Sequence, residues 1–291
     1  MMIAVKNLSI LLSTGMWLVK DSNIQPMYIY LTTSVNNYIS VFNVKLDYSN
    51  SSGKNSQITI NENDIKNCKK MMDLLYNPLL DIKNSENKKP TQLLINQSSY
   101  YEVNRNLSTV NPSFTKTLML IQEARNTSFL ASKIDKYIAA IQCVFAVKDN
   151  FTFNCSRITA AYISNNSSEN KEILEFISNG YYIRSQVSHG KQVDEKKFDI
   201  EKISNRLDSY IRRIMKKVLV NSDLNYFSLE EEQKVRNYFK EIARRKFEME
   251  YAQLKQSNRL NGIKKNIEGI KDLDTLLDLE TKIIQQMDKL K

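Results

Sequence analysis

Residues 168–190, SENKEILEFISNGYYIRSQVSHG, are the most informative segment of the chain and contain its only histidine. Its composition predicts a helix, because Ser168 can cap the N-terminus, carboxylates follow in the first turn and Gly190 can end it. At about 100° per residue, the apolar side chains fall on one side: Ile173, Phe176, Ile183 and Val187. The opposite side carries a polar stripe, made of Tyr181, Arg184, Ser185, Ser188 and His189. We therefore expect a helix that packs through one face and presents polar groups on the other.

Arg184 and His189 are the residues of the polar stripe with the most useful chemistry. Four residues separate them in the sequence, so they lie about 140° apart around the helix axis. The two side chains therefore lie at opposite edges of the polar stripe. Both can bind one phosphate only if the phosphate lies across the helix face, or if a second copy of the helix supplies one of the two residues. Such a pair also arises by chance, and a partly buried, hydrogen-bonded histidine is the ordinary structural alternative.

The length and charge of the chain are those of a globular protein with a basic surface. At 291 residues it can form one large or two modest domains, each with its own core. The formal net charge of +10 suits a polyanionic partner such as nucleic acid, because basic surface gains affinity by releasing counterions. Lysine, asparagine and isoleucine are abundant throughout, so a compositional bias of the genome is an alternative source of this charge.

The cysteines and the single histidine bear on compartment and cofactors. Cys68, Cys143 and Cys155 are odd in number and lack the spacing of metal ligands, so we expect a reduced, cytoplasmic protein without a metal or other cofactor. The apolar run from Leu8 to Val19 resembles the core of a signal peptide, but no cleavage site of small residues follows, and we interpret it as a strand. No apolar window reaches the length of a membrane span, so no membrane partner is expected.

All four prolines lie in the first 112 residues, which predicts a domain boundary near residue 110 because long helices avoid proline. We interpret residues 1–110 as a mixed α/β sensing or interaction region that is rich in strands. Segments with β-branched and aromatic residues predict the strands: 1–12, 27–33, 38–48, 57–60 and 91–103. Helical spacing predicts one helix in this region, at 63–76.

From Pro112 onward the spacing of apolar residues becomes helical. Residues 111–225 are expected to form a helical bundle, and residues 226–291 a C-terminal helical extension. The predicted helices follow one another with short connections: about 113–124, 134–145, 154–163, 168–190, 199–220, 228–256 and a pair within 260–290. The fold class predicted from the sequence is thus α+β, a strand-rich N-terminal region followed by an all-α bundle.

The sequence YYIRSQVSHG, residues 181–190, resembles the signature of the HEPN superfamily, in which a histidine follows an arginine after a few residues. It is most similar to the Apea-like HEPN branch, where a tyrosine precedes the arginine, a serine follows it and a glycine follows the histidine. Residues 133–145, 154–161 and 199–220 resemble, in order, the long helix, the short helix and the helix after the motif in that branch. The resemblance covers roughly residues 116–220.

This resemblance implies an HEPN-type bundle that acts as a metal-independent endoribonuclease and homodimer, often in antiphage defence, abortive infection or toxin systems. Arg184 and His189 would be the catalytic residues, supported by Tyr181, Ser185 and Ser188. Many HEPN nucleases carry Asn, Asp or His directly after the arginine, where this chain has Ser185. By analogy, an activator or antitoxin protein would bind the N-terminal region.

The residues fit this chemistry independently of the resemblance. Cleavage of RNA by its own 2′-hydroxyl needs a base for that hydroxyl, a cation for the phosphate and an acid for the leaving 5′-oxygen. Histidine suits either proton transfer near neutral pH, and arginine offers a permanently charged, planar fork for phosphate. One chain with one histidine cannot supply both the base and the acid, whereas two copies related by a twofold axis can.

Further basic residues are candidates for guiding RNA through phosphate contacts. They are Arg157 in the predicted short helix, Arg212 and Arg213 in the helix after the motif, and the cluster at 244–246. Ion pairs inside the bundle and solvated helix faces are the alternatives, because acidic residues are interleaved with them. Two other functions stay open: a non-catalytic dimer that binds RNA or a nucleotide, and a polar stripe that serves only as a dimer contact.

Overall fold

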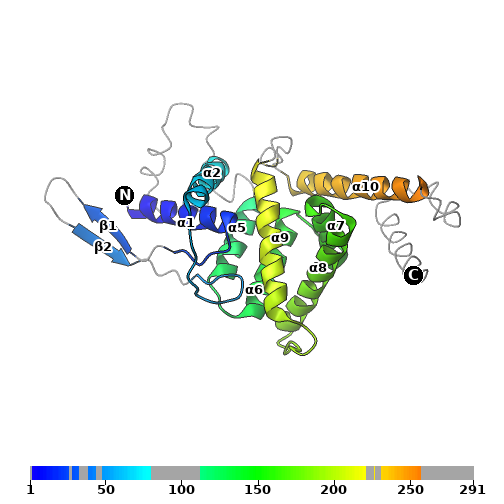
Figure 1. Cartoon of the computed structure of the whole chain (residues 1–291), viewed down its shortest axis with the longest axis horizontal. Coiled ribbons are helices and arrows are strands. Elements are labelled where there is room, and N and C mark those ends of the chain that lie inside the picture. Colours follow the sequence, from blue (N-terminus) through cyan, green and yellow to red (C-terminus); the bar gives the residue numbers. More distant parts are fainter. Residues whose placement is uncertain are drawn as a thin grey trace. The chain divides into compact units, whose positions relative to one another are not determined.

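The computed structural model describes residues 2–25, 28–32, 39–43, 48–79, 112–220, 226 and 231–256. The chain divides into two compact units, residues 1–236 and 237–291. Figure 1 shows the elements of the described part: α1 (Met2–Val19), β1 (Tyr28–Thr32), β2 (Ile39–Asn43), α2 (Glu62–Leu79), α5 (Pro112–Arg125), α6 (Leu130–Val144), α7 (Phe151–Ile163), α8 (Ser167–Ser188), α9 (Ile200–Val220) and α10 (Glu232–Gln256). The predicted boundary near residue 110 falls outside the described residues and stays a prediction.

The strand-rich N-terminal region predicted from the sequence is wrong, because the described part is dominated by helices. The two strand predictions over 1–12 and Leu8–Val19 fall on one helix, α1, of 18 residues. A continuous apolar run does not by itself distinguish a strand from a buried helix, and this run exceeds the usual length of a strand. Strand structure is confined, among the described residues, to the antiparallel hairpin of β1 and β2, which pairs Tyr28 with Asn43. Residues 57–60 are not a strand, and 91–103 lie outside the described part.

The predicted helices of the bundle are confirmed, with small shifts at their ends. α8 begins earlier than expected, because Asn166 rather than Ser168 is its N-cap. The Oδ1 atom of Asn166 accepts a hydrogen bond from the Glu169 amide at 2.9 Å, and the Glu169 carboxylate accepts one from the Asn165 amide at 2.6 Å. This arrangement resembles a capping box, except that the carboxylate accepts from the residue before the N-cap. α8 ends as predicted at Gly190, whose φ of +64° is the left-handed conformation that follows many helices.

The bundle is built around α6, which packs against α5, α7, α8 and α9. Eight of its side chains are buried: Ala131, Lys133, Ile134, Tyr137, Ile138, Ala140, Ile141 and Val144. Gly180 lets α8 approach closely, because a Cβ atom there would lie 2.7 Å from Ile138 Cδ1 and 3.0 Å from Leu207 Cδ1. The polar end of α8 is therefore held on two well-packed helices, α6 and α9.

The N-terminal helices pack onto the same bundle. Figure 1 shows α9 with α1 and α2 on one side and α8 on the other. The carboxylate of Asp208, fully buried on α9, accepts hydrogen bonds from Trp17 Nε1 at 2.8 Å and from the Tyr137 hydroxyl at 2.9 Å. Arg212 Nε donates to the same carboxylate at 2.7 Å. A buried carboxylate is stable only with such partners, so Asp208 links α1, α6 and α9.

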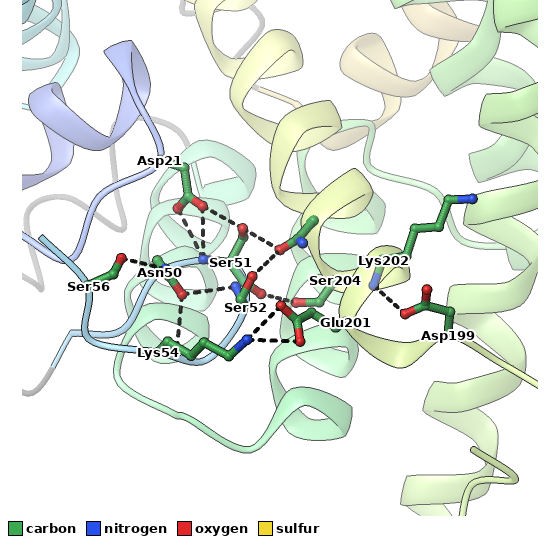
Figure 2. Close-up of polar contacts among 11 residues, drawn as sticks. Asp21, Asn50, Ser51, Ser52, Lys54, Ser56, Asp199, Glu201, Lys202 and Ser204 are labelled. Atoms are coloured by element: carbon green, nitrogen blue, oxygen red, sulfur yellow. Dashed lines mark hydrogen bonds and ion pairs between the residues drawn. The ribbon is translucent and has the colours of Figure 1, made fainter. Parts of the chain in front are cut away.

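A polar loop, residues 48–56, joins the N-terminal part to the first turn of α9. Figure 2 shows this loop with Asp21 on one side and Ser204 and Glu201 of α9 on the other. The main-chain amide of Ser51 donates to the Asp21 carboxylate at 3.1 Å, and Ser204 Oγ donates to the Ser51 carbonyl oxygen at 2.6 Å. The Lys54 ammonium lies 2.9 Å from Glu201 Oε1. Burial, and next the charge of Asp208, raises the pKa of Asp21.

The loop depends on a glycine, Gly53, because its φ of +72° is strained for other residues. A Cβ atom there would also lie 2.4 Å from the carbonyl oxygen of Ser128, before α6. The loop therefore packs closely against the residues that precede α6 as well as against α9.

The second unit, residues 237–291, is described only for the remainder of α10. Its basic cluster is paired: Arg244 contacts Glu241 at 2.7 Å and Glu248 at 2.6 Å, and Arg245 contacts Glu241 at 2.9 Å. Hydrogen bonds from Arg244, and next from Arg245, lower the pKa of Glu241 to about 2. This arrangement is typical of an ion-paired helix surface. Among the described helices, none combines the length and apolar composition needed to cross a membrane.

Candidate functional site

Arg184 lies near the C-terminal end of α8, with its guanidinium against α6. Its Nε atom is 3.1 Å from Asp135 Oδ1, and its Nη1 atom donates to Gln142 Oε1 at 3.1 Å. Both partners are on one face of α6, since seven residues separate them. The side chains of Arg184 and Asp135 are 30% and 24% exposed. A guanidinium has five N–H donors, so these contacts leave donors for a phosphate.

Tyr181, predicted to support the site, instead connects α8 to α7. Its hydroxyl donates to the sulfur of Cys155 at 3.0 Å. Burial raises the pKa of Tyr181, and it raises the pKa of the Cys155 thiol to about 12. The positive charge of Arg184 opposes both shifts, which places the guanidinium close to this pair. Tyr181 therefore positions the helix that carries Arg184, and its hydroxyl is already engaged.

His189 is the C-cap of α8, and its side chain is exposed. Its main-chain amide donates to the Ser185 carbonyl oxygen at 3.2 Å, but no described residue forms a hydrogen bond with the imidazole. The side chains of Ser185 and Ser188 are also exposed. The imidazole and both hydroxyls are therefore accessible to a ligand. This differs from the partly buried, hydrogen-bonded histidine that was the structural alternative to a catalytic role.

Arg184 and His189 point in different directions from the same helix end. About 7 Å of helix axis and about 140° of rotation separate them, and the guanidinium makes its contacts toward α6. A phosphate bound by both groups has to lie across the end of α8. A single chain thus presents an open site rather than an enclosed pocket.

A groove of about 1330 Å³ lies beside this helix end. It is bordered by the start of α6, the end of α8, the loop over residues 190–199 and the start of α9. Its lining residues are Ser128, Phe129, Leu130, Ala131, Val187, Gly190, Lys191, Gln192, Val193, Glu195, Lys196, Lys197, Phe198, Asp199, Ile200 and Glu201. Val187 and Gly190 flank Ser188 and His189 in the chain, so the histidine is adjacent in sequence to the groove lining but is not itself part of it.

The charges of the groove favour an anionic ligand. Three lysines line it: Lys191, Lys196 and Lys197. Of its three carboxylates, Glu201 pairs with the Lys54 ammonium, whereas Glu195 and Asp199 keep their charges, since Asp199 accepts a hydrogen bond only from the main-chain amide of Lys202 at 2.9 Å. Within the described part, none of the three lysines is paired with a carboxylate. The ammonium groups of the groove are therefore available for phosphates.

The three arginines predicted to bind RNA lie elsewhere. Arg212 is tied to the buried Asp208. Arg213 contacts Glu169 Oε1 at 2.6 Å and also donates to a main-chain carbonyl of α7, and its hydrogen bond lowers the pKa of Glu169. The guanidinium of Arg157 stacks on the Phe153 ring at 5.3 Å. The described lining of the groove includes none of the three, and their contacts are those of structural residues.

Several residues of the site escaped the sequence analysis. Asp135 and Gln142 share a face of an otherwise apolar helix, and this seven-residue spacing was the available signal. The lysines that follow His189 in the chain were a second signal, because a short loop keeps them near the helix end.

The described residues contain no group of three or more His, Cys, Asp or Glu side chains arranged to hold a metal ion. No family model matches the chain, and comparisons with curated proteins and with solved structures found no significant match.

Proposed function

We propose that this protein is a metal-independent endoribonuclease of HEPN type, which cleaves RNA by attack of the 2′-hydroxyl in a site shared by two copies. The observation that carries this proposal is the exposed imidazole of His189, which stands with Arg184 on one helix end beside a groove lined by unpaired lysines. The combination supplies a proton-transfer group, a fixed cation and a channel for a polyanion. Abortive infection, as a form of antiphage defence, or a toxin system is the setting that the HEPN resemblance implies.

In this proposal the two imidazoles divide the proton transfers between them. One copy of His189 accepts the proton of the 2′-hydroxyl, and the other donates a proton to the leaving 5′-oxygen. The 2′-oxygen bonds to phosphorus as the bond to the 5′-oxygen breaks, which yields a 2′,3′-cyclic phosphate. The free N–H groups of Arg184 bind the non-bridging phosphate oxygens, where negative charge accumulates. Ser185 and Ser188 are placed to donate further hydrogen bonds.

The pairing of Arg184 with Asp135 gives the guanidinium a fixed orientation. A side chain held in place before the substrate arrives loses less entropy when it binds the phosphate. Asp135 also opposes phosphate binding, because the two anions compete for the same cation. Asp135 therefore orients Arg184 and at the same time weakens its attraction for phosphate.

A labelled RNA incubated in EDTA with the wild type and with His189→Ala tests the proposal. We expect cleavage that persists in EDTA, products that end in 2′,3′-cyclic phosphate, and a loss of at least about 100-fold in the variant, the usual scale of one acid–base group. Ser178→Ala is the matched control, since it changes an exposed side chain about three turns earlier on the same face of α8. Mixing wild-type with His189→Ala chains tests the shared site. A mixed dimer retains one imidazole where the mechanism needs two, so activity should fall with the square of the wild-type fraction rather than in proportion to it.

A wild type that cuts no RNA, or a His189→Ala variant that cuts as fast as Ser178→Ala, contradicts the proposal. The same samples test the second candidate, a dimer that binds RNA without cutting it. The observation that favours this candidate is the occupation of Arg184 by Asp135 and Gln142. It predicts RNA binding that falls in Arg184→Ala, and no cleavage by any variant.

A further inference from the structure

We infer that a base-stacking platform for single-stranded RNA lies at the edge of the groove, formed by Tyr182 together with two residues of the groove lining, Lys197 and Phe198; this inference deepens the proposed function and rests on it. The rings of Tyr182 and Phe198 lie 5.0 Å apart between centroids, with 32° between their planes. The Lys197 ammonium is 5.4 Å from the Tyr182 centroid and 5.2 Å from that of Phe198. Two rings and a cation thus meet at one point of the surface.

The position of Tyr182 connects this platform to the candidate catalytic group. His189 follows Tyr182 by seven positions, which is 20° short of two full turns, so both lie on one face of α8 about 10 Å apart along the axis. Lys197 and Phe198 line the groove that runs past His189. A strand that places a base on the platform therefore carries its phosphates along the groove toward the imidazole.

Exposure distinguishes this platform from ordinary core packing. The Tyr182 residue is 43% exposed, although aromatic rings that only stabilise a fold are mostly buried. Phe129, an aromatic residue of the groove lining, is 66% exposed on the connection that precedes α6. Exposed aromatic rings interleaved with lysines are the arrangement with which proteins bind single strands, because bases stack on the rings and phosphates contact the cations. A duplex hides its bases and cannot use the rings.

The affinity of His189→Ala chains for fluorescein-labelled oligouridine, measured by anisotropy, tests the inference without cleavage of the probe. Adding Tyr182→Leu is expected to weaken binding about tenfold, the scale of one stacked base, whereas adding Tyr182→Phe retains the affinity. Leucine keeps much of the apolar packing and loses the aromatic face, so this pair separates stacking from support of the loop. Phe151→Ala is the matched control, because Phe151 is 42% exposed, close to the 43% of Tyr182, but lies at the start of α7 and is not part of the platform.

Further measurements with the same assay identify the class of ligand and the contribution of the Lys197 charge to binding. Adding Lys197→Ala should reduce the slope of log affinity against log salt concentration by about 0.7, the contribution of one phosphate contact on a single strand. A single-stranded DNA of equal length should bind nearly as well as the RNA, and a duplex RNA at least tenfold more weakly. Equal binding by Tyr182→Leu and Tyr182→Phe, or preference for the duplex, overturns the inference. Stacking-dependent binding without cleavage by the wild type refutes the proposed function alone, and cleavage without an effect of Tyr182 refutes the inference alone.

Discussion

Tyr137→Phe tests whether the N-terminal helices and the bundle fold as one cooperative unit. The change removes only the hydroxyl that donates to Asp208 at 2.9 Å and keeps a ring that is fully buried. A hydrogen bond to a charged group contributes about 1.5–3 kcal/mol. Because Trp17 and Arg212 continue to serve the carboxylate, we expect a loss near the middle of this range, about 2 kcal/mol. In a unit of this size that corresponds to a fall in Tm of roughly 4–8 °C.

The only tryptophan of the chain, Trp17, supplies the probe. Its fluorescence follows the contact between α1 and Asp208, while circular dichroism at 222 nm follows all helices. Both thermal transitions should coincide in the wild type and shift together in Tyr137→Phe. Tyr210→Phe is the control, since the Tyr210 hydroxyl makes only a long contact of 3.5 Å to Glu172, and it should change Tm by no more than about 2 °C. The reasoning would be refuted if Tyr137→Phe shifted only the fluorescence transition and left the main dichroism transition unchanged. In that case α1 would unfold independently of the bundle.

Three further predictions concern the site, a buried charge and two glycines. Asp135→Asn removes the negative charge that competes with phosphate for Arg184 but keeps a hydrogen-bond acceptor, so RNA affinity should rise about three- to fivefold. Anisotropy in the His189→Ala background measures this affinity, and an unchanged or weaker affinity contradicts the prediction. Burial lowers the pKa of Lys133 to about 8. The charged form of Lys133 therefore destabilises the folded state below pH 8, and this destabilisation disappears as the pH rises toward the pKa that Lys133 has in the unfolded chain. Between about pH 7 and 9.5, urea unfolding should show the wild type gaining about 2 kcal/mol relative to Lys133→Met, and parallel curves would disprove it. Gly53→Ala should lower the free energy of unfolding by about 3 kcal/mol and Gly190→Ala by about 1 kcal/mol, because both glycines have positive φ but only at Gly53 would a Cβ atom clash with a main-chain oxygen. Equal losses of unfolding free energy in chemical denaturation would exclude the clash as a cause.

The helices of the bundle could be predicted from the sequence because their apolar spacing agrees with their packing. α9 is the clearest case: Ile203, Leu207, Ile211 and Ile214 recur every three or four residues, and all four are buried. α1 could not be predicted in this way, because it is apolar on most sides and lacks that period. One polar anchor of this helix, the indole of Trp17, bonds to a residue 191 positions away, which local sequence cannot show.

The candidate site was predictable only where it lies on one element. The order of Arg184, Ser188 and His189 along α8 follows from helical geometry, and so does their separation around the axis. The partner Asp135 and the loop lysines come from other segments, and their approach depends on Gly180, which sets the distance between α8 and α6. Tyr181 shows the same limit: its place on the polar stripe was correct as geometry, but its hydroxyl turns to Cys155 of α7.

The N-terminal part also shapes the groove, through the first turn of α9. Glu201 lines the groove, and its pairing with Lys54 removes one negative charge that would otherwise repel a phosphate. Ser51 and Ser204 hold the same loop in place, and Gly53 sets it against the residues that precede α6 (Figure 2). Displacement of this loop would uncover Glu201 and loosen two walls of the groove together. The loop contacts Asp21, which follows α1, and it also contacts residues of both walls, so the N-terminal part and the groove share this loop.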